Sequence, residues 1–129
     1  MVKQLAILKK DAALAIFDGR KKIEGRFSKI KIDPFNKVSR GDVVLMKLPG
    51  EDIIGQFIVD RVISYDHPTE FEFSDLKKKY QSELALNSDF WREREKINYI
   101  TLMFIKSASK FIVPPQIAKR DLRPWVVLG

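Results

Sequence analysis

The sequence GRKKIEGR at residues 19–26 marks the passage from a helix into a strand. A helical pattern runs over residues 11–17 and stops at Gly19, a residue that readily adopts the left-handed conformation that ends helices. Over residues 22–28 apolar and polar side chains then alternate, as they do in a strand. This stretch therefore predicts a short helix that leads directly into a strand with one charged face.

The charged face of that strand places Glu24 between Lys22 and Arg26, with Lys21 at the entrance of the strand. Neighbours on one face of a strand lie roughly 6 to 7 Å apart, so the carboxylate can pair with the flanking cations. We expect this row to face solvent, where it would suit an anionic or polar planar ligand. The alternative is a solvated strand face whose charges cancel, because exposed ion pairs contribute little to stability.

Length and composition indicate one ordinary globular domain over residues 1–129, with 45% hydrophobic residues and nine phenylalanines. The absence of cysteine excludes disulfides, thiolate catalysis and cysteine-ligated zinc, and a single histidine, His67, excludes a two-histidine metal site. We expect no metal and no cofactor. No segment approaches the roughly 20 apolar residues that span a bilayer, and the N-terminus lacks a signal-peptide pattern. The prediction is a cytoplasmic protein that does not bind membranes.

Positive charge is concentrated at the two ends of the chain. Residues 1–50 hold 12 Lys and Arg against 5 Asp and Glu, residues 51–98 hold 7 against 11, and residues 99–129 hold 5 against 1. If the first and last strands share a sheet, these ends form one basic face that attracts polyanions. A lysine-rich surface that serves solubility or ion-pair networks is the alternative.

The apolar and β-branched segments predict a small, mostly antiparallel barrel with flanking helices, an α+β fold. Gly55 is the predicted position of a bulge that bends a long strand. An acidic helical excursion is expected over residues 66–98, with Ser74 and Ser88 as the caps of helices over 75–86 and 89–97. The predicted strands are residues 4–8, 22–28, 43–47, 53–64, 99–106 and 125–128.

The spacing Gly19-x-Lys21-x-x-Glu24-x-Arg26, followed by Gly41-Asp42 at the entry to the next strand, resembles the ASCH domain, the activating-signal-cointegrator homology family of the PUA-like superfamily. The resemblance covers most of the chain apart from the helical excursion. It implies a β-barrel with a cleft beside the first helix, in which the family's lysine, glutamate and arginine map onto Lys21, Glu24 and Arg26.

The resemblance implies binding of RNA or of a modified nucleotide, without a base preference or an oligomeric state. Further cations would widen the basic surface of the cleft, and aromatic side chains would stack on bases. The cations are Lys22, Arg40, Lys119, Arg120 and Arg123, and the candidate aromatics are Phe35, Tyr65, Trp91 and Trp125, for each of which a place in the core is the alternative.

Two other functions stay open at the level of sequence. Some bacterial members of the family hydrolyse acetylated cytidine with a lysine that corresponds to Lys21 and a threonine three residues later. Glu24 occupies that threonine position here, so Lys21 and Glu24 are the catalytic candidates if the protein is an enzyme. The acidic helices could also bind a protein partner, whereas His67, between Asp66 and Pro68, is expected in an exposed turn.

Overall fold

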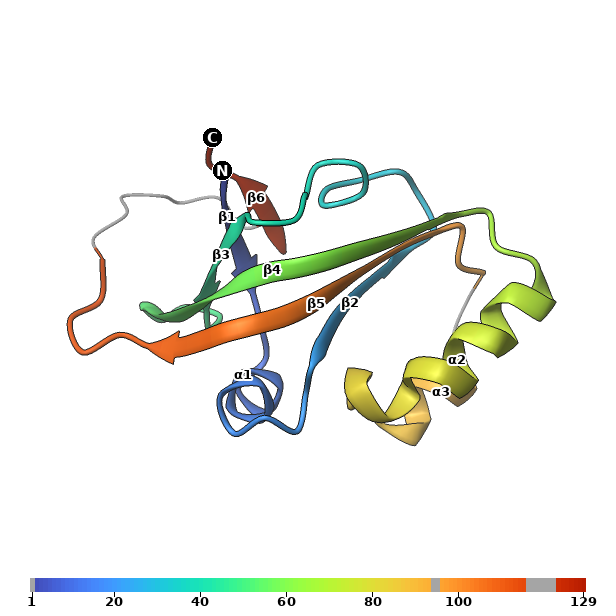
Figure 1. Cartoon of the computed structure of the whole chain (residues 1–129), viewed down its shortest axis with the longest axis horizontal. Helices are drawn as coiled ribbons and strands as arrows, with labels where there is room; N and C mark the ends of the chain where they lie inside the picture. Colours follow the sequence, from blue (N-terminus) through green and yellow to red (C-terminus); the bar gives the residue numbers. More distant parts are fainter. Residues whose placement is uncertain (1, 94–95, 116–122) are drawn as a thin grey trace.

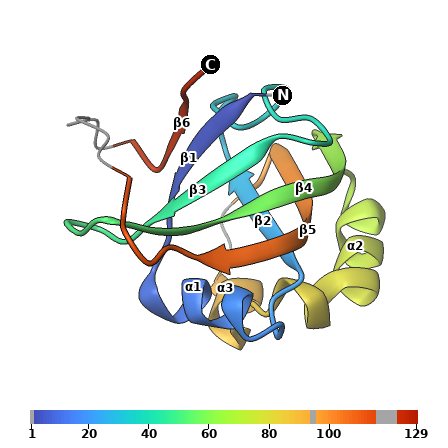
Figure 2. The same ribbon diagram turned by 60° about the vertical axis from the view of Figure 1, so that its left-hand side comes forward.

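A computed structural model describes residues 2–93, 96–115 and 123–129. Its centre is one six-stranded sheet in the order β2-β5-β4-β3-β1-β6, and all neighbours are antiparallel except β1 and β3. The sheet curls into a half-barrel whose edges are β2 and β6 (Figures 1 and 2). The expected mixed, mostly antiparallel barrel-like fold with flanking helices is confirmed. The strands are β1 (Lys3–Ile7), β2 (Ile23–Ser28), β3 (Val43–Lys47), β4 (Ile53–Asp66), β5 (Tyr99–Lys110) and β6 (Trp125–Val127).

The two long strands β4 and β5 supply the curvature. Met46 of β3 pairs with Gly55, whereas Lys47 pairs with Ile53, so Ile54 is an extra residue and the bulge expected near Gly55 is present. A Cβ at position 55 would lie 2.4 Å from the Ser109 carbonyl oxygen and 2.6 Å from the Phe17 ring. Only glycine therefore fits where the helix after β1 closes on the bent strand.

In the described residues three helices flank the sheet: α1 (Lys10–Phe17) follows β1, and α2 (Glu70–Leu84) and α3 (Ser88–Glu93) lie between β4 and β5. The expected caps of the acidic helices are wrong by a few residues. Thr69 begins α2, because its side chain and that of Glu72 form a reciprocal capping box. At α3 the Asn87 side chain, rather than that of Ser88, accepts a hydrogen bond from the Phe90 backbone N–H.

The apolar side chains form clusters on both faces of the sheet. The inner cluster packs α1 against β1, β3 and β4, and the cluster beneath α2 joins Ile23, Leu76 and Leu102. A third cluster includes Leu5, Leu45 and Val126 on the other side of β1, β3 and β6. Because β2 carries Ile23 towards α2, its neighbour Glu24 points into the half-barrel. In the described residues no helix is both long and apolar enough to cross a membrane.

Candidate functional site

A cavity of about 450 Å³ opens between the two edges of the curled sheet. Residues from the end of β2, from the loop at 32–35, from β5 and from the start of β6 line it. The cavity lies away from α1, so it differs in position from the cleft expected beside the first helix. The lining side chains are Arg26, Phe27, Ser28, Ile32, Asp33, Pro34, Phe35, Thr101, Arg123, Pro124 and Trp125.

Arg26 spans the gap between the two edge strands. Its guanidinium donates to the Ile7 carbonyl oxygen at the end of β1 (3.1 Å) and to the Pro124 carbonyl oxygen before β6 (3.4 Å). Its Nε donates to a carboxylate oxygen of Glu24 at 2.8 Å, and its Cζ lies 5.0 Å from the centre of the Trp125 ring. One side chain of β2 thus holds the opposite edge of the half-barrel in place.

Lys21 and Glu24 do not face solvent, so the expected exposed charged row is wrong for these two residues. They are 3% and 4% exposed, and the Lys21 Nζ lies 3.5 Å from a Glu24 carboxylate oxygen. The Lys21 Nζ also donates to the Leu84 carbonyl oxygen at 2.5 Å, at the C-terminal end of α2. The end of α2 covers the lysine, and a cation at a helix C-terminus also complements the helix dipole.

A second buried cluster fixes the Trp125 wall of the cavity. The Trp125 indole N–H donates to the Gln4 side-chain oxygen at 2.7 Å. The Gln4 amide nitrogen donates to Asp42 at 2.8 Å and to the Lys37 carbonyl oxygen at 2.9 Å. Asp42 also accepts the backbone N–H groups of Val2 and Ser39. Asp42 was expected at the entry to a strand. Its carboxylate also connects the preceding turn to β1 and, through Gln4, to Trp125 of β6.

The structure separates the four predicted stacking aromatics into two groups. Phe35 and Trp125 line the cavity, and the Phe35 ring meets that of Tyr99 edge-on at 4.9 Å. Tyr65 and Trp91 pack instead against the cluster beneath α2. His67 is exposed beside Asp66, as expected for a turn.

The predicted cations also divide. Arg26 and Arg123 line the cavity. Lys22 is exposed, and its backbone bonds to Glu83 and Ile105. Arg40 is also exposed, at the turn in which the Gly41 N–H bonds to the Val59 carbonyl oxygen. Neither of these two cations lines the cavity. Lys119 and Arg120 lie outside the described residues.

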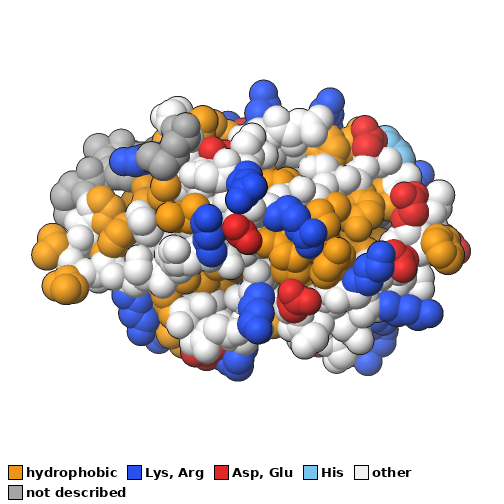
Figure 3. Space-filling view, in the orientation of Figure 1, with side chains coloured by type: hydrophobic (Ala, Val, Ile, Leu, Met, Phe, Trp, Pro, Cys, Tyr) orange, Lys and Arg blue, Asp and Glu red, His pale blue; other side chains and the backbone are white. Residues whose placement is uncertain are grey.

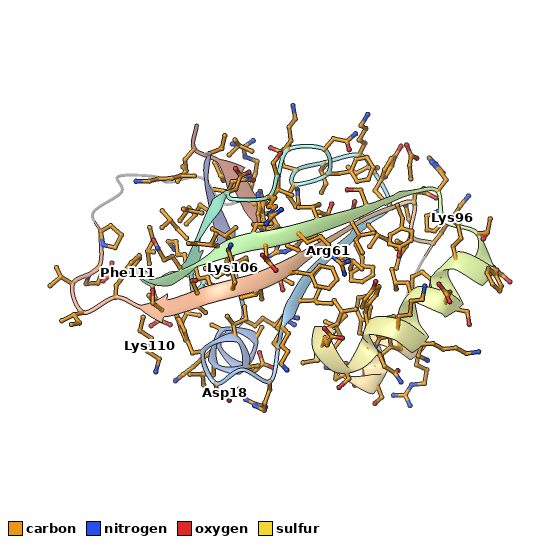
Figure 4. All side chains as sticks on the ribbon, viewed as in Figure 1. Asp18, Arg61, Lys96, Lys106, Lys110 and Phe111 are labelled. Carbon is orange, nitrogen blue, oxygen red and sulfur yellow. The ribbon has the colours of Figure 1, made fainter. Side chains whose placement is uncertain are left out.

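Other cations lie over β4 and β5. Arg61 lies 4.0 Å from the Phe104 ring centre, and Lys106 pairs with Asp60 at 3.6 Å (Figure 4). Figure 3 shows both signs of charge interleaved with apolar side chains on this face. Such a face is less suited to a polyanion than a single-sign surface.

Sequence reasoning did not single out Gln4, Thr101 or Asp33. Gln4 is a polar residue inside an apolar strand, a pattern that signals a buried hydrogen-bond partner. Thr101 pairs with Arg26 across β2 and β5, and its place in the cavity depends on that register. Within the described residues no three His, Cys, Asp or Glu side chains gather as metal ligands would.

The described chain is a curled half-barrel with a helix after its first strand and a cavity where its edges meet, an α+β fold of the ASCH/PUA-like kind. More narrowly, the chain has the ASCH fold. It is similar to the ASCH protein of Zymomonas mobilis, with a TM-score of 0.71 and 17% identity over 98% of this chain and 87% of that chain. Serine-to-alanine and tyrosine-to-phenylalanine variants of that protein give TM-scores of 0.70 and 0.69 and are covered over 88% and 90% of their lengths. No family model and no curated protein matches the chain.

Proposed function

We propose that the protein binds RNA or a modified nucleotide, with one nucleotide unit held in the cavity between the edge strands. The observation that carries this proposal is the Arg26 guanidinium, fixed by Glu24 and two carbonyl oxygens beside an aromatic wall. These contacts use three of its five N–H groups. In the described part of the chain, two remain for a ligand, and its side chain is 20% exposed.

The remaining lining suits a flat, polar heterocycle. Phe35, Pro34 and Ile32 provide apolar surface, Thr101 a hydroxyl group and Asp33 a carboxylate. An arginine fork can donate to carbonyl or phosphate oxygens, and a carboxylate can accept from an exocyclic amine. This combination of apolar walls with a few convergent polar groups is typical of small-ligand sites.

The distribution of charge supports an anionic ligand. The two basic ends of the sequence meet, because β1 pairs with β6. The residues that line the cavity all come from those two ends: 26–28 and 32–35 from the first, and 101 and 123–125 from the last. A net charge of +7 favours association with a polyanion at low salt.

Substitution of Ile32 tests the proposal, because this side chain lines the cavity and is 48% exposed. We expect Ile32→Glu to weaken binding of ribonucleoside monophosphates, including acetylated cytidine monophosphate, by about tenfold, since the new carboxylate repels the phosphate. Ile32→Gln controls for size, and Ile112→Glu places the same charge on a fully exposed position outside the cavity. Titration calorimetry measures the three affinities. No binding by the unaltered protein, or equal binding by all variants, would refute the proposal.

The other two functions stay predictions. For acetylated-cytidine hydrolysis, Lys21 and Glu24 would have to reach a substrate, yet neither lines the cavity and Lys21 is held by Leu84. Turnover that is lost in Lys21→Ala would favour the enzyme. For a protein partner on the acidic helices, Phe71, 79% exposed on α2, is the side chain to substitute.

A further inference from the structure

The segment at residues 29–32, with the sequence KIKI, follows the lining residue Ser28 and presents two isoleucines to solvent. Ile30 is 64% exposed and Ile32 is 48% exposed, and Ile32 also lines the cavity. Exposed isoleucines forgo the stabilisation that burial of an apolar side chain gives. Two of them beside a cavity indicate a contact surface.

The backbone of this segment is held by defined hydrogen bonds. The Asn98 side chain donates to the Lys29 carbonyl oxygen at 2.8 Å, and its backbone N–H donates to Ser28 at 3.0 Å. The Ser28 hydroxyl donates to the Ile30 carbonyl oxygen at 2.8 Å. The isoleucines are therefore presented from a fixed backbone, so little further ordering of that backbone is needed when a ligand binds.

The side chains of the segment alternate between cationic and apolar. Lys29 and Lys31 are exposed and flank Ile30, and the nearest lining cations are Arg26 and Arg123. Lysines are point charges for phosphate, and apolar side chains pack against unstacked bases. Charge complementarity and continuity with the cavity together favour a single-stranded nucleic acid as the occupant.

We infer that the ligand is a single strand of RNA rather than a free nucleotide: one nucleotide enters the cavity, and residues 29–32 contact the next nucleotides of the same strand. This inference rests on the proposed function. It assigns Ile30 and Lys31 to ligand outside the cavity, where a mononucleotide does not reach.

The experiment compares mononucleotides with five-nucleotide RNAs of oligo(A), oligo(C) and oligo(U), by fluorescence anisotropy for the RNAs and calorimetry for the monophosphates. We expect at least one pentamer to bind about tenfold or more tightly than its monophosphate. Ile30→Ser and Lys31→Gln should each weaken binding of that pentamer by about three- to tenfold and leave the affinity for the monophosphate unchanged. Lys31→Gln should also reduce the slope of the logarithm of pentamer affinity against the logarithm of salt concentration by about 0.7, the value for one phosphate contact.

Matched controls are Ile112→Ser, at an isoleucine that is fully exposed elsewhere, and Lys78→Gln on the exposed side of α2. The inference would be overturned, and the proposed function left standing, if pentamers bind no more tightly than monophosphates. The same follows if Ile30→Ser and Lys31→Gln bind pentamers as tightly as the unaltered protein does. No binding of either ligand would overturn both. Binding of poly-glutamate as tight as RNA, and equally sensitive to Ile30→Ser, would overturn the inference in favour of an acidic protein partner.

Discussion

The two walls of the cavity are held by buried polar clusters of different chemistry. On the β6 wall, Trp125 is fixed by the Gln4 amide, which Asp42 holds in turn. On the β2 wall, Arg26 is fixed by Glu24, which also lies beside the Lys21 ammonium. The β6 wall, the hydrogen-bonded wall, depends on directional hydrogen bonds, and the β2 wall, the ionic wall, depends on two ion pairs.

The difference indicates which wall a ligand can use. Gln4 and Asp42 are enclosed, and their contacts are satisfied by Trp125 and by backbone groups. Arg26 is bound on one side by Glu24 and remains partly exposed on the other. For the proposed ligand, the ionic wall therefore offers the free donors, whereas the hydrogen-bonded wall positions an aromatic surface.

The largest effect should follow loss of the carboxylate that both cations share. Glu24→Ala leaves the Lys21 ammonium buried without its counterion and removes the Nε partner of Arg26. We expect the free energy of unfolding to fall by about 3 to 5 kcal/mol, the usual cost of breaking a buried ion pair. Urea denaturation measures it. Glu51→Ala, at an exposed position, is the matched control, and a loss no larger than in that control would show that the ionic wall is dispensable.

The hydrogen-bonded wall should respond to Asp42→Ala with a smaller loss. This change removes the acceptor of three donors: the partly buried N–H groups of Val2 and Ser39, which water can still reach, and the Gln4 amide, which keeps its bond to the Lys37 carbonyl oxygen. We expect a loss of about 2 to 3 kcal/mol. Exposed Asp52 provides the control substitution to alanine. A loss larger than that of Glu24→Ala would reverse the ranking of the two walls.

The fold was largely predictable because strand signals are local. Period-two alternation and β-branched content place all six strands, and residues 43–47 match β3 at both ends. The predicted end of the fifth strand, residue 106, falls short of Lys110 because Ser107 has a positive φ, a local departure that no alternation reveals. The helix caps were missed because Thr69 and Asn87 compete with equally suitable serines nearby.

The site was less predictable because its contacts are distant in sequence. The motif brought Lys21, Glu24 and Arg26 together correctly, but the burial of Lys21 depends on Leu84, 63 residues away. Gln4 and Trp125 are 121 residues apart. Alternation assigns a residue to one face of a strand and does not say whether a helix or another strand covers that face.

Replacing Lys21 separates the structural role of the ionic wall from its proposed role in binding. Lys21→Met keeps the length of the side chain and leaves Glu24 paired with Arg26, while removing the contact with Leu84. We expect a loss of about 1 to 2 kcal/mol, because an apolar replacement also removes the cost of burying the ammonium. Hydrogen exchange should increase in the last turn of α2. Nucleotide affinity should match that of Lys22→Met, and a clear additional loss would place Lys21 at the ligand.

The smallest effect is the coupling between Gln4 and Trp125. Gln4→Met and Trp125→Phe each remove their shared hydrogen bond; the first nearly keeps the side-chain shape, and the volume that the second loses cancels in the double-mutant cycle. The loss of unfolding free energy in the double variant should therefore be smaller than the sum of the two single losses by about 1 kcal/mol. In a Trp91→Phe background, Gln4→Met should also shift the emission of Trp125, the one tryptophan left in the chain. Additive losses with unchanged emission would mean that the indole position is set by packing against Arg26 and the inner cluster, and that the ionic wall holds both sides of the cavity.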